Sequence, residues 1–264
     1  MSTNFSQFLG RIAMKGAFVS LLGALVVSCS GCGGGGDGAG SPATTAHTAA
    51  VQPVLIEAYG DSTTEGWQVI QGVGQVTPNS EPVELQKMLR DRFGDSVTVA
   101  NRGVGGTQAS QLLNGTDGVH ARWADQMAAS KAQIVTLNFG LNDAYYSVKV
   151  SKNPNIVPES PTDFESTMTQ LVQIARKNGK LIVIFEPNPT CEETRAPLMQ
   201  QYVDALRRVA ATESVPIVNE FDQIRNLSEW PTLLSDCLHP TDHGYLMKAG
   251  FELPAVSALV QAYR

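Results

Sequence analysis

The chain has 264 residues, of which 42% are hydrophobic and 17% are charged, and its formal net charge at pH 7 is −6. This composition is ordinary for a soluble globular protein with a sizeable core, and the length fits one large domain or two small ones. The acidic balance, with no cluster of Lys and Arg longer than a pair, argues against nucleic acid as a partner.

The first 28 residues have the pattern of an export signal and not of a folded domain. Basic residues precede an apolar run, residues 17–27, that is too short to span a bilayer as an ordinary transmembrane helix. The run leads into Val26-Val27-Ser28-Cys29, which resembles the lipobox of bacterial lipoproteins, whose cysteine is lipidated and becomes the mature N-terminus. We therefore expect an exported protein, lipid-anchored through Cys29 to a bacterial membrane and facing the periplasm or the cell surface. A plain secretory signal, which would give a secreted protein, stays open, and so does a start at Met14 instead of Met1.

Residues 29–52 are rich in Gly, Ala, Thr and Ser and show no hydrophobic periodicity. This composition predicts a flexible tether between the anchor and a folded domain over residues 53–264. Cys29 and Cys32 formally match C-x-x-C, but no βαβ pattern surrounds them, so a redox motif is not expected. His47 lies in the tether, where we expect it to be solvated.

The remainder of the chain alternates between short apolar runs and segments of helical periodicity. The strands are predicted at residues 53–58, 96–100, 133–139, 180–185 and 215–218, and the helices at 82–93, 108–113, 121–130, 162–177, 196–212 and from 241 onwards. Near-continuous Val, Ile and Leu runs alternating with helices predict a single α/β domain with a mostly parallel five-stranded sheet covered on both faces. Residues 63–82 and 144–160 are predicted to be long polar loops, the first of them a wall of a binding site.

Three groups of polar or glycine residues follow predicted strands, at the sheet edge where open α/β sheets place their sites. They include Ser62, Gly106 and Asn142, and a fourth element near the C-terminus supplies Asp236 and His239. His239 would take the proton of the Ser62 hydroxyl as general base, and Asp236 would hold the imidazole in the required tautomer. The backbone N–H groups of Ser62 and Gly106, with the side-chain amide of Asn142, would form an oxyanion hole.

These segments, in this order, resemble the sequence blocks of the SGNH (GDSL-type) hydrolases. The matching segments are Gly60-Asp61-Ser62, Gly106, Gly140-Leu141-Asn142-Asp143 and Asp236-Cys237-Leu238-His239. The resemblance extends from about residue 55 to the C-terminus. It implies a flavodoxin-like three-layer α/β/α sandwich and a serine esterase that needs no metal or other cofactor. Gly103 or Gly105 could take the oxyanion role in place of Gly106.

The remaining histidines allow one competing interpretation. Asp236, His239 and His243 could be three metal ligands, but Pro240 keeps His239 out of the helical geometry that would align it with His243. We therefore expect no metal, and we expect His120 to be a capping or surface residue.

Several other residues have structural and functional interpretations of equal weight. Trp67, Tyr145 and Tyr146 could line the substrate site or pack in the core. Asp61 and Asp143 are expected to bond the backbone of turns and not to act as acid–base groups. Cys191 and Cys237, in an exported chain, form either a disulfide or two unpaired buried thiols.

The sequence thus predicts an esterase that cleaves carboxylic esters with short acyl groups through a Ser62–His239–Asp236 acyl-enzyme mechanism. The glycine-rich rim and polar loop fit a small acyl group on a polar alcohol, such as an O-acetylated carbohydrate. Three alternatives remain open: an acyltransferase to a sugar hydroxyl, a lysophospholipase or thioesterase, and a non-catalytic carbohydrate-binding protein of the cell surface. Oligomeric state is not indicated.

Overall fold

The computed structural model describes residues 52–264. The predicted signal peptide (1–28), the lipidated Cys29 and all but the last residue of the predicted tether (29–52) lie outside the described residues. Within residues 52–264, no helix is both long and apolar enough to cross a membrane.

The centre of the domain is a five-stranded, all-parallel sheet with the order β4-β1-β5-β6-β7. The strands are β1 (Val54–Gly60), β4 (Val97–Gly103), β5 (Ile134–Asn138), β6 (Leu181–Phe185) and β7 (Ile217–Val218). When only these five strands are numbered in chain order, the order across the sheet is 2-1-3-4-5. This is the order of flavodoxin-like folds, so the predicted fold class is confirmed. In the register, Gly60 of β1 lies opposite both Gly103 of β4 and Asn138 of β5, so the carboxyl ends of three strands meet at one edge.

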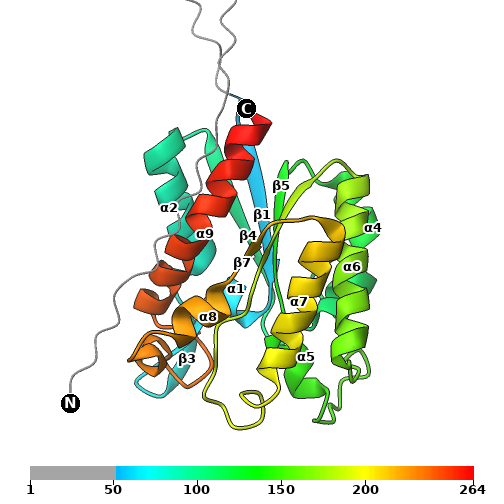
Figure 1. Ribbon diagram of the computed structural model, residues 1–264, viewed down its shortest axis with the longest axis vertical. Helices are drawn as coiled ribbons and strands as arrows, with labels where there is room; N and C mark the ends of the chain where they lie inside the picture. The colour runs from blue at the N-terminus through cyan, green and yellow to red at the C-terminus, as the bar shows by residue number, and fades with distance from the viewer. Residues whose placement is uncertain (1–51) are drawn as a thin grey trace, which may run out of the picture. The chain divides into compact units, whose positions relative to one another are not determined.

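Helices cover both faces of the sheet, as Figure 1 shows with α2 and α9 on one side and α4, α6 and α7 on the other. The first face packs against α2 (Glu81–Phe93) and α9 (Asp242–Tyr263), and the second against α3 (Ala109–Asn114), α4 (Trp123–Ala129), α6 (Pro161–Lys177) and α7 (Met199–Glu213). All five residues of β5 are buried, because a central parallel strand has both faces covered. This burial is the reason for its continuous apolar sequence.

One layer of the core contains a cluster of four fully buried charged residues, Lys248, Glu81, Glu220 and Glu252, each 0% exposed. They come from α9, α2 and α8 (Glu220–Arg225), and the Lys248 ammonium lies 2.7 Å from a Glu220 oxygen and 3.6 Å from a Glu81 oxygen. One lysine cannot neutralise three carboxylates. Burial, partly opposed by Lys248, therefore raises the pKa of Glu81 to about 7, and burial with the neighbouring carboxylates raises the pKa of Glu252 well above its ordinary value.

The predicted strands and helices are found to within a few residues, whereas the two predicted loops contain more regular structure than expected. The segment after Ser62 holds a short helix, α1 (Ser62–Glu65), and an antiparallel hairpin of β2 (Trp67–Ile70) and β3 (Val73–Val76). The hairpin turns at Gln71 and Gly72, which both have positive φ, as a two-residue type I′ turn requires. The second loop begins later than predicted, because α5 (Leu141–Tyr146) occupies its first residues.

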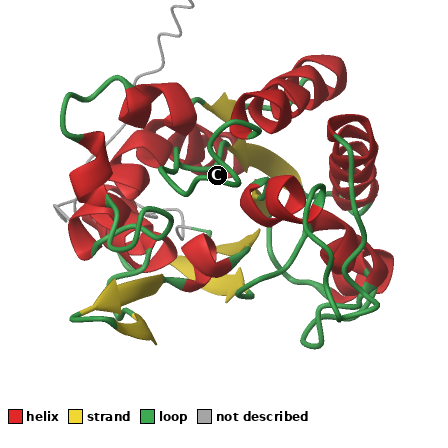
Figure 2. Cartoon of the chain, turned by 90° about the horizontal axis from the view of Figure 1, so that it is seen from below, coloured by secondary structure: helices red, strands yellow, loops and turns green. Residues whose placement is uncertain are grey.

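Two smaller differences lie in the last third of the chain. Helix α7 begins at Met199 instead of 196: Pro197 disfavours helical geometry at the residue before it, and residues 193–198 form turns that lead into the helix. A 3₁₀ turn (Trp230–Leu233) follows α8 and leads into the loop that carries Asp236 and His239. Figure 2 views the domain along the sheet from below, the end at which α1, the hairpin and these loops gather.

Candidate active site

Ser62 lies at the junction between the first strand and a short helix. β1 ends at Gly60, and α1 begins at Ser62 with Asp61 as its N-cap, whose carboxylate accepts hydrogen bonds from the Thr63 backbone and hydroxyl at 2.8 and 2.9 Å. A Cβ at Gly60 would lie 2.6 Å from the Asn138 carbonyl oxygen, so only glycine fits this turn. The tight turn places the Ser62 hydroxyl outside the sheet edge, 3.0 Å from His239 Nε2.

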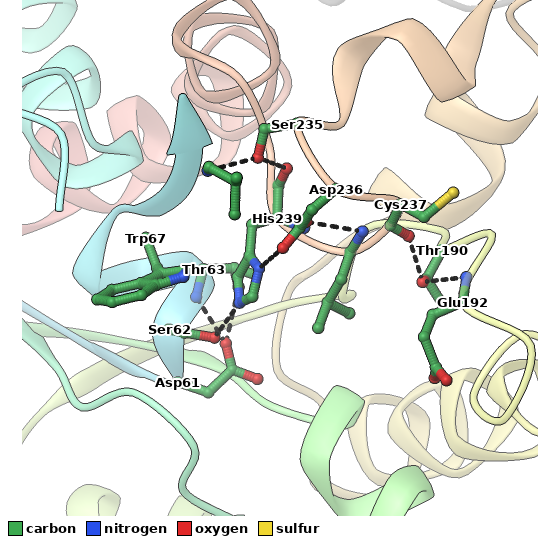
Figure 3. A network of polar contacts seen from close by, with 12 residues as sticks. Asp61, Ser62, Thr63, Trp67, Thr190, Glu192, Ser235, Asp236, Cys237 and His239 are labelled. Atoms are coloured by element: carbon green, nitrogen blue, oxygen red, sulfur yellow. Dashed lines mark hydrogen bonds and ion pairs between the residues drawn. The ribbon is translucent and has the colours of Figure 1, made fainter. Parts of the chain in front are cut away.

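Asp236 and His239 share a single tight turn before α9. One oxygen of Asp236 accepts the backbone N–H groups of Leu238 and His239, and the other lies 2.8 Å from His239 Nδ1 (Figure 3). Cys237, between them, adopts a left-handed φ of 68°, which closes the turn. The spacing of three residues therefore lets the carboxylate hold both the backbone and the ring of the same histidine.

The ionisation of Asp236 follows from these contacts. Partial burial would raise its pKa, but the hydrogen bonds from the His239 backbone and ring, together with the charge of that ring, outweigh burial and lower the pKa below its ordinary value. Asp236 is thus an anion at neutral pH. As an acceptor it keeps the proton of the imidazole on Nδ1 and leaves Nε2 free to accept the Ser62 proton.

The loop that carries His239 is fixed at two places, at Ser235 and at Cys237. Ser235 Oγ accepts the Val69 N–H of the hairpin at 3.0 Å and donates to the His239 carbonyl oxygen at 3.0 Å. The structure joins Cys191 and Cys237 by a disulfide, and Thr190 Oγ1 donates to the Cys237 carbonyl oxygen at 2.6 Å. Figure 3 shows the Ser235 hydroxyl and the contact between Thr190 and Cys237 on different sides of the Asp236–His239 pair.

The turn after β4 brings the backbone of Gly105 and Gly106 to the cleft that Ser62 also lines. Within residues 52–264, Gly105 and Gly106 donate no backbone hydrogen bond, and Ser62, as the first residue of α1, has no intrahelical acceptor. Gly103 is different, because its N–H donates to Asn101 Oδ1 at 2.9 Å and its α-carbon packs against the α1 backbone. Of the three glycines considered for the oxyanion hole, Gly105 and Gly106 therefore have free donors, and Gly103 does not.

Asn142, on the first turn of α5, brings a side-chain amide to the same place. Its Nδ2 lies 3.0 Å from the Thr107 carbonyl oxygen and 3.4 Å from Asp61 Oδ2, and its Oδ1 lies 3.4 Å from Arg195 Nη2. One Nδ2 hydrogen donates to Thr107, and the other makes the longer contact, to Asp61. A bound ester oxygen would have to compete with Asp61 for this second hydrogen.

Asp61 and Asp143 have the structural roles expected of them. Asp143 accepts the N–H groups of Ala109 and Gly140, both at 2.9 Å, and so ties the start of α3 to the start of α5. Burial raises the pKa of both carboxyls, for Asp143 well above its ordinary value, and these hydrogen bonds oppose the shift only in part.

These groups line a cleft of about 540 Å³. Its walls are formed by Ser62, Glu65, Trp67, Val104, Gly105, Gly106, Asn142, Tyr146, Arg195, Leu238 and His239. Of the aromatic residues considered, Trp67 and Tyr146 face the cleft, whereas the Tyr145 ring packs 4.1 Å from the Arg195 guanidinium carbon. The sequence did not indicate Glu65, Val104 or Arg195, since no local pattern distinguishes them.

A second cleft, of about 700 Å³, lies away from Ser62 and includes Glu57, Arg102 and Ser130. Its buried carboxylate already has all its partners, because Glu57 accepts from Tyr59, Ser130 and Arg102. This is the arrangement of a structural ion-pair network. His120 also has a partner, its Nδ1 lying 2.7 Å from Asp117. Among residues 52–264 no group of three His, Cys, Asp or Glu side chains is arranged to hold a metal, and His243 lines a separate surface pocket.

The sequence of this chain matches the model of one known protein family. The model of the GDSL-like lipase/acylhydrolase family matches residues 58–247, which is most of the chain. A comparison with curated proteins found no match.

Solved structures share the fold at low sequence identity. A protein described as a GDSL-like lipase from Parabacteroides merdae superposes with a TM-score of 0.63 at 16% identity, over 78% of this chain and 96% of that one. A lipase/acylhydrolase from Enterococcus faecalis gives 0.60 at 14%, over 78% and 96%. An acetylxylan esterase from Geobacillus stearothermophilus gives 0.56 at 17%, over 80% and 95%.

Proposed function

This chain belongs to the GDSL-like lipase/acylhydrolase family and is a carboxylic ester hydrolase, and we propose that it works through a covalent acyl-enzyme on Ser62. The observation that carries the mechanism is the continuous line of contacts from Ser62 Oγ to His239 Nε2, at 3.0 Å, and from His239 Nδ1 to Asp236, at 2.8 Å. A serine hydroxyl is a weak nucleophile without such a base.

The proposed reaction follows from the positions of these groups. Ser62 Oγ attacks the ester carbonyl carbon while its proton passes to His239 Nε2, and Asp236 stabilises the imidazolium. The N–H groups of Ser62 and Gly106 donate to the developing oxyanion, with Gly105 as the neighbouring donor, and so does the Asn142 amide hydrogen that makes the longer contact, to Asp61. His239 then returns the proton to the leaving alcohol oxygen as the ester C–O bond breaks. In the second half, His239 takes a proton from a water molecule that attacks the acyl carbon, the bond from that carbon to Ser62 Oγ breaks to release the acid, and His239 returns the proton to Ser62 Oγ.

We propose a short acyl group on a polar alcohol as the substrate, with an O-acetylated carbohydrate as the leading candidate. The cleft is modest in volume, and its lining combines the charged side chains of Glu65 and Arg195 with the aromatic side chain of Trp67. A flat aromatic ring next to polar groups suits a sugar, which has apolar C–H faces and hydroxyl edges. Acetylxylan esterases among proteins of similar fold support this choice.

The test compares p-nitrophenyl acetate, butyrate and octanoate as substrates for wild type, Ser62→Ala and Ser166→Ala. Ser166 is an exposed serine on α6, which makes it a matched control for the substitution itself. We expect hydrolysis that falls with acyl length, is lost in Ser62→Ala and is unchanged in Ser166→Ala. Hydrolysis that survives in folded Ser62→Ala would refute the mechanism. Release of acetate from acetylated xylo-oligosaccharides would then test the alcohol side.

We further propose that the enzyme is exported and held to a membrane by a lipid on Cys29, on the basis of the lipobox-like sequence alone. Mass spectrometry of the mature N-terminus tests this. The proposal predicts a diacylglyceryl-modified Cys29, and a mature chain that begins elsewhere would contradict it.

A further inference from the structure

Arg195 is buried next to the proposed oxyanion hole, an unusual place for an arginine. It lies in the irregular segment between β6 and α7, is only 9% exposed, and lines the cleft. Burying a guanidinium is costly unless its N–H groups find acceptors. Three acceptors are present: the Leu141 carbonyl oxygen at 3.1 Å, Glu192 at 3.1 Å and Asn142 Oδ1 at 3.4 Å.

The contact with Asn142 decides which way that amide faces. In the observed orientation, Oδ1 lies next to a guanidinium N–H, and Nδ2 donates to the Thr107 carbonyl oxygen at 3.0 Å. After a 180° flip, the NH₂ group would face the donors of Arg195, and the amide oxygen would face the Thr107 oxygen. Both contacts would become repulsive. Arg195 and Thr107 together therefore exclude the flipped amide.

The guanidinium itself has little freedom. Its plane lies over the Tyr145 ring, with 4.1 Å from the central carbon to the ring centroid, and Glu192 holds both its backbone N–H and its Nη1. Leu141, which accepts from Nε, is the residue immediately before Asn142. Arg195 thus donates hydrogen bonds to a backbone oxygen and to a side-chain oxygen of the same turn of α5.

We propose that Arg195 is a positioning residue for the oxyanion hole: it fixes the Asn142 amide with Oδ1 against the guanidinium and Nδ2 beside Asp61 and Thr107, and it polarises the amide so that the N–H with the longer contact, to Asp61, becomes a stronger donor to a bound ester oxygen. This inference rests on the proposed function, because it assumes that Asn142 donates to the oxyanion. A positive charge at Oδ1 draws electron density away from Nδ2, as along any chain of hydrogen bonds. The effect grows as negative charge develops on the substrate oxygen, so it stabilises the transition state more than the bound ester.

The experiment is a double-mutant cycle on the full-length chain with p-nitrophenyl acetate. The variants are Arg195→Gln, Asn142→Ala and the combination, with Arg208→Gln as the matched control. Arg208 also pairs with a carboxylate, Glu165 at 2.8 Å, but it is half exposed and lies on α7 outside the cleft. Thermal unfolding by circular dichroism establishes that each variant is folded, and Arg195→Met, which also removes the charge, replaces Arg195→Gln in the cycle if the latter does not fold.

We expect Arg195→Gln to lower kcat roughly 10- to 100-fold, the range for loss of a charged hydrogen bond, with KM nearly unchanged. In the Asn142→Ala background the same substitution should have little further effect, because the group through which it acts is gone. Arg208→Gln should match wild type.

Two results would overturn the inference. If Arg195→Gln lowers kcat by the same factor in the Asn142→Ala background as in wild type, Arg195 acts independently of the amide. If folded Arg195→Gln has the kcat of wild type, Arg195 does not contribute to the oxyanion hole. Failure of the proposed function would be seen in a different variant: folded Ser62→Ala would then still hydrolyse p-nitrophenyl acetate, regardless of the result for the Arg195 variants.

Discussion

Replacing Glu81 by Gln should change how the stability of the protein depends on pH. Glu81 is fully buried beside Lys248, Glu220 and Glu252, and its pKa is raised from 4.5 to about 7. Since the folded state binds the proton more tightly than the unfolded state, the free energy of unfolding falls as pH rises between these two values. The stabilisation is fully present below about pH 4.5 and is lost as pH passes through about 7.

The size of the effect follows from the shift. At 1.36 kcal/mol per pKa unit, the full contribution is about 3 kcal/mol, most of which is lost between pH 5 and 8. Glutamine has nearly the same shape and carries no titrating proton, so Glu81→Gln should lack this contribution. We expect the unfolding free energy of wild type to fall about 2–3 kcal/mol further than that of Glu81→Gln over this range.

Urea denaturation followed by circular dichroism at pH 5, 6, 7 and 8 measures this difference directly. Glu84→Gln is the matched control, because Glu84 lies one turn further along α2 and pairs with Lys87 near the surface at 2.6 Å. It should keep the wild-type slope, since the buried cluster remains intact. Parallel pH profiles for wild type and Glu81→Gln would refute the reasoning, because they would mean that Glu81 is already ionised in the folded state.

Three further predictions concern the site and its supports. Asn142→Ala should lower kcat by about 10²–10³ while the unfolding free energy stays near wild type, because one oxyanion donor is lost; steady-state kinetics with an unchanged kcat would remove Asn142 from the oxyanion hole. Asp236→Asn should lower kcat by roughly 10³–10⁴, since an amide no longer fixes the His239 tautomer, and a variant as fast as wild type would exclude Asp236 from the mechanism. Joint replacement of Cys191 and Cys237 by Ser opens a cross-link with a sequence separation of 46. It should lower the unfolding free energy by about 4 kcal/mol in urea denaturation, and a loss near zero would show that the unfolded chain gains no freedom.

The parts of the fold that could be predicted are those in which burial and sequence pattern agree. β1, β5 and β6 are buried on both faces, so their apolar runs are unmistakable, and Ser62, Asn142 and the Asp236–His239 turn follow from residue order along the chain. The hairpin was not predicted, because Val73–Val76 is exposed throughout and Gln71-Gly72 lacks the usual Asn-Gly or Asp-Gly signal.

Other features depend on contacts that no local pattern encodes. Lys248 and Glu252 are four residues apart on a helix, which is the spacing of an ordinary surface ion pair, yet α2 and α8 bury both of them. Arg195 lies in an irregular segment, and its importance is visible only when α5 is placed beside it. Sequence alone therefore indicated the groups that we propose to react but not the residues that hold them.

The order in which the chain is made has a consequence for when the enzyme can act. Ser62 and His239 are separated by 177 residues, so the serine is synthesised early and its partner within the last tenth of the chain. In the proposed mechanism, a nascent or truncated chain therefore carries a serine that no base activates and that cannot attack cellular esters. The same separation makes hydrolytic activity a sensitive reporter of complete folding, because the two ends of the domain must meet before any turnover begins.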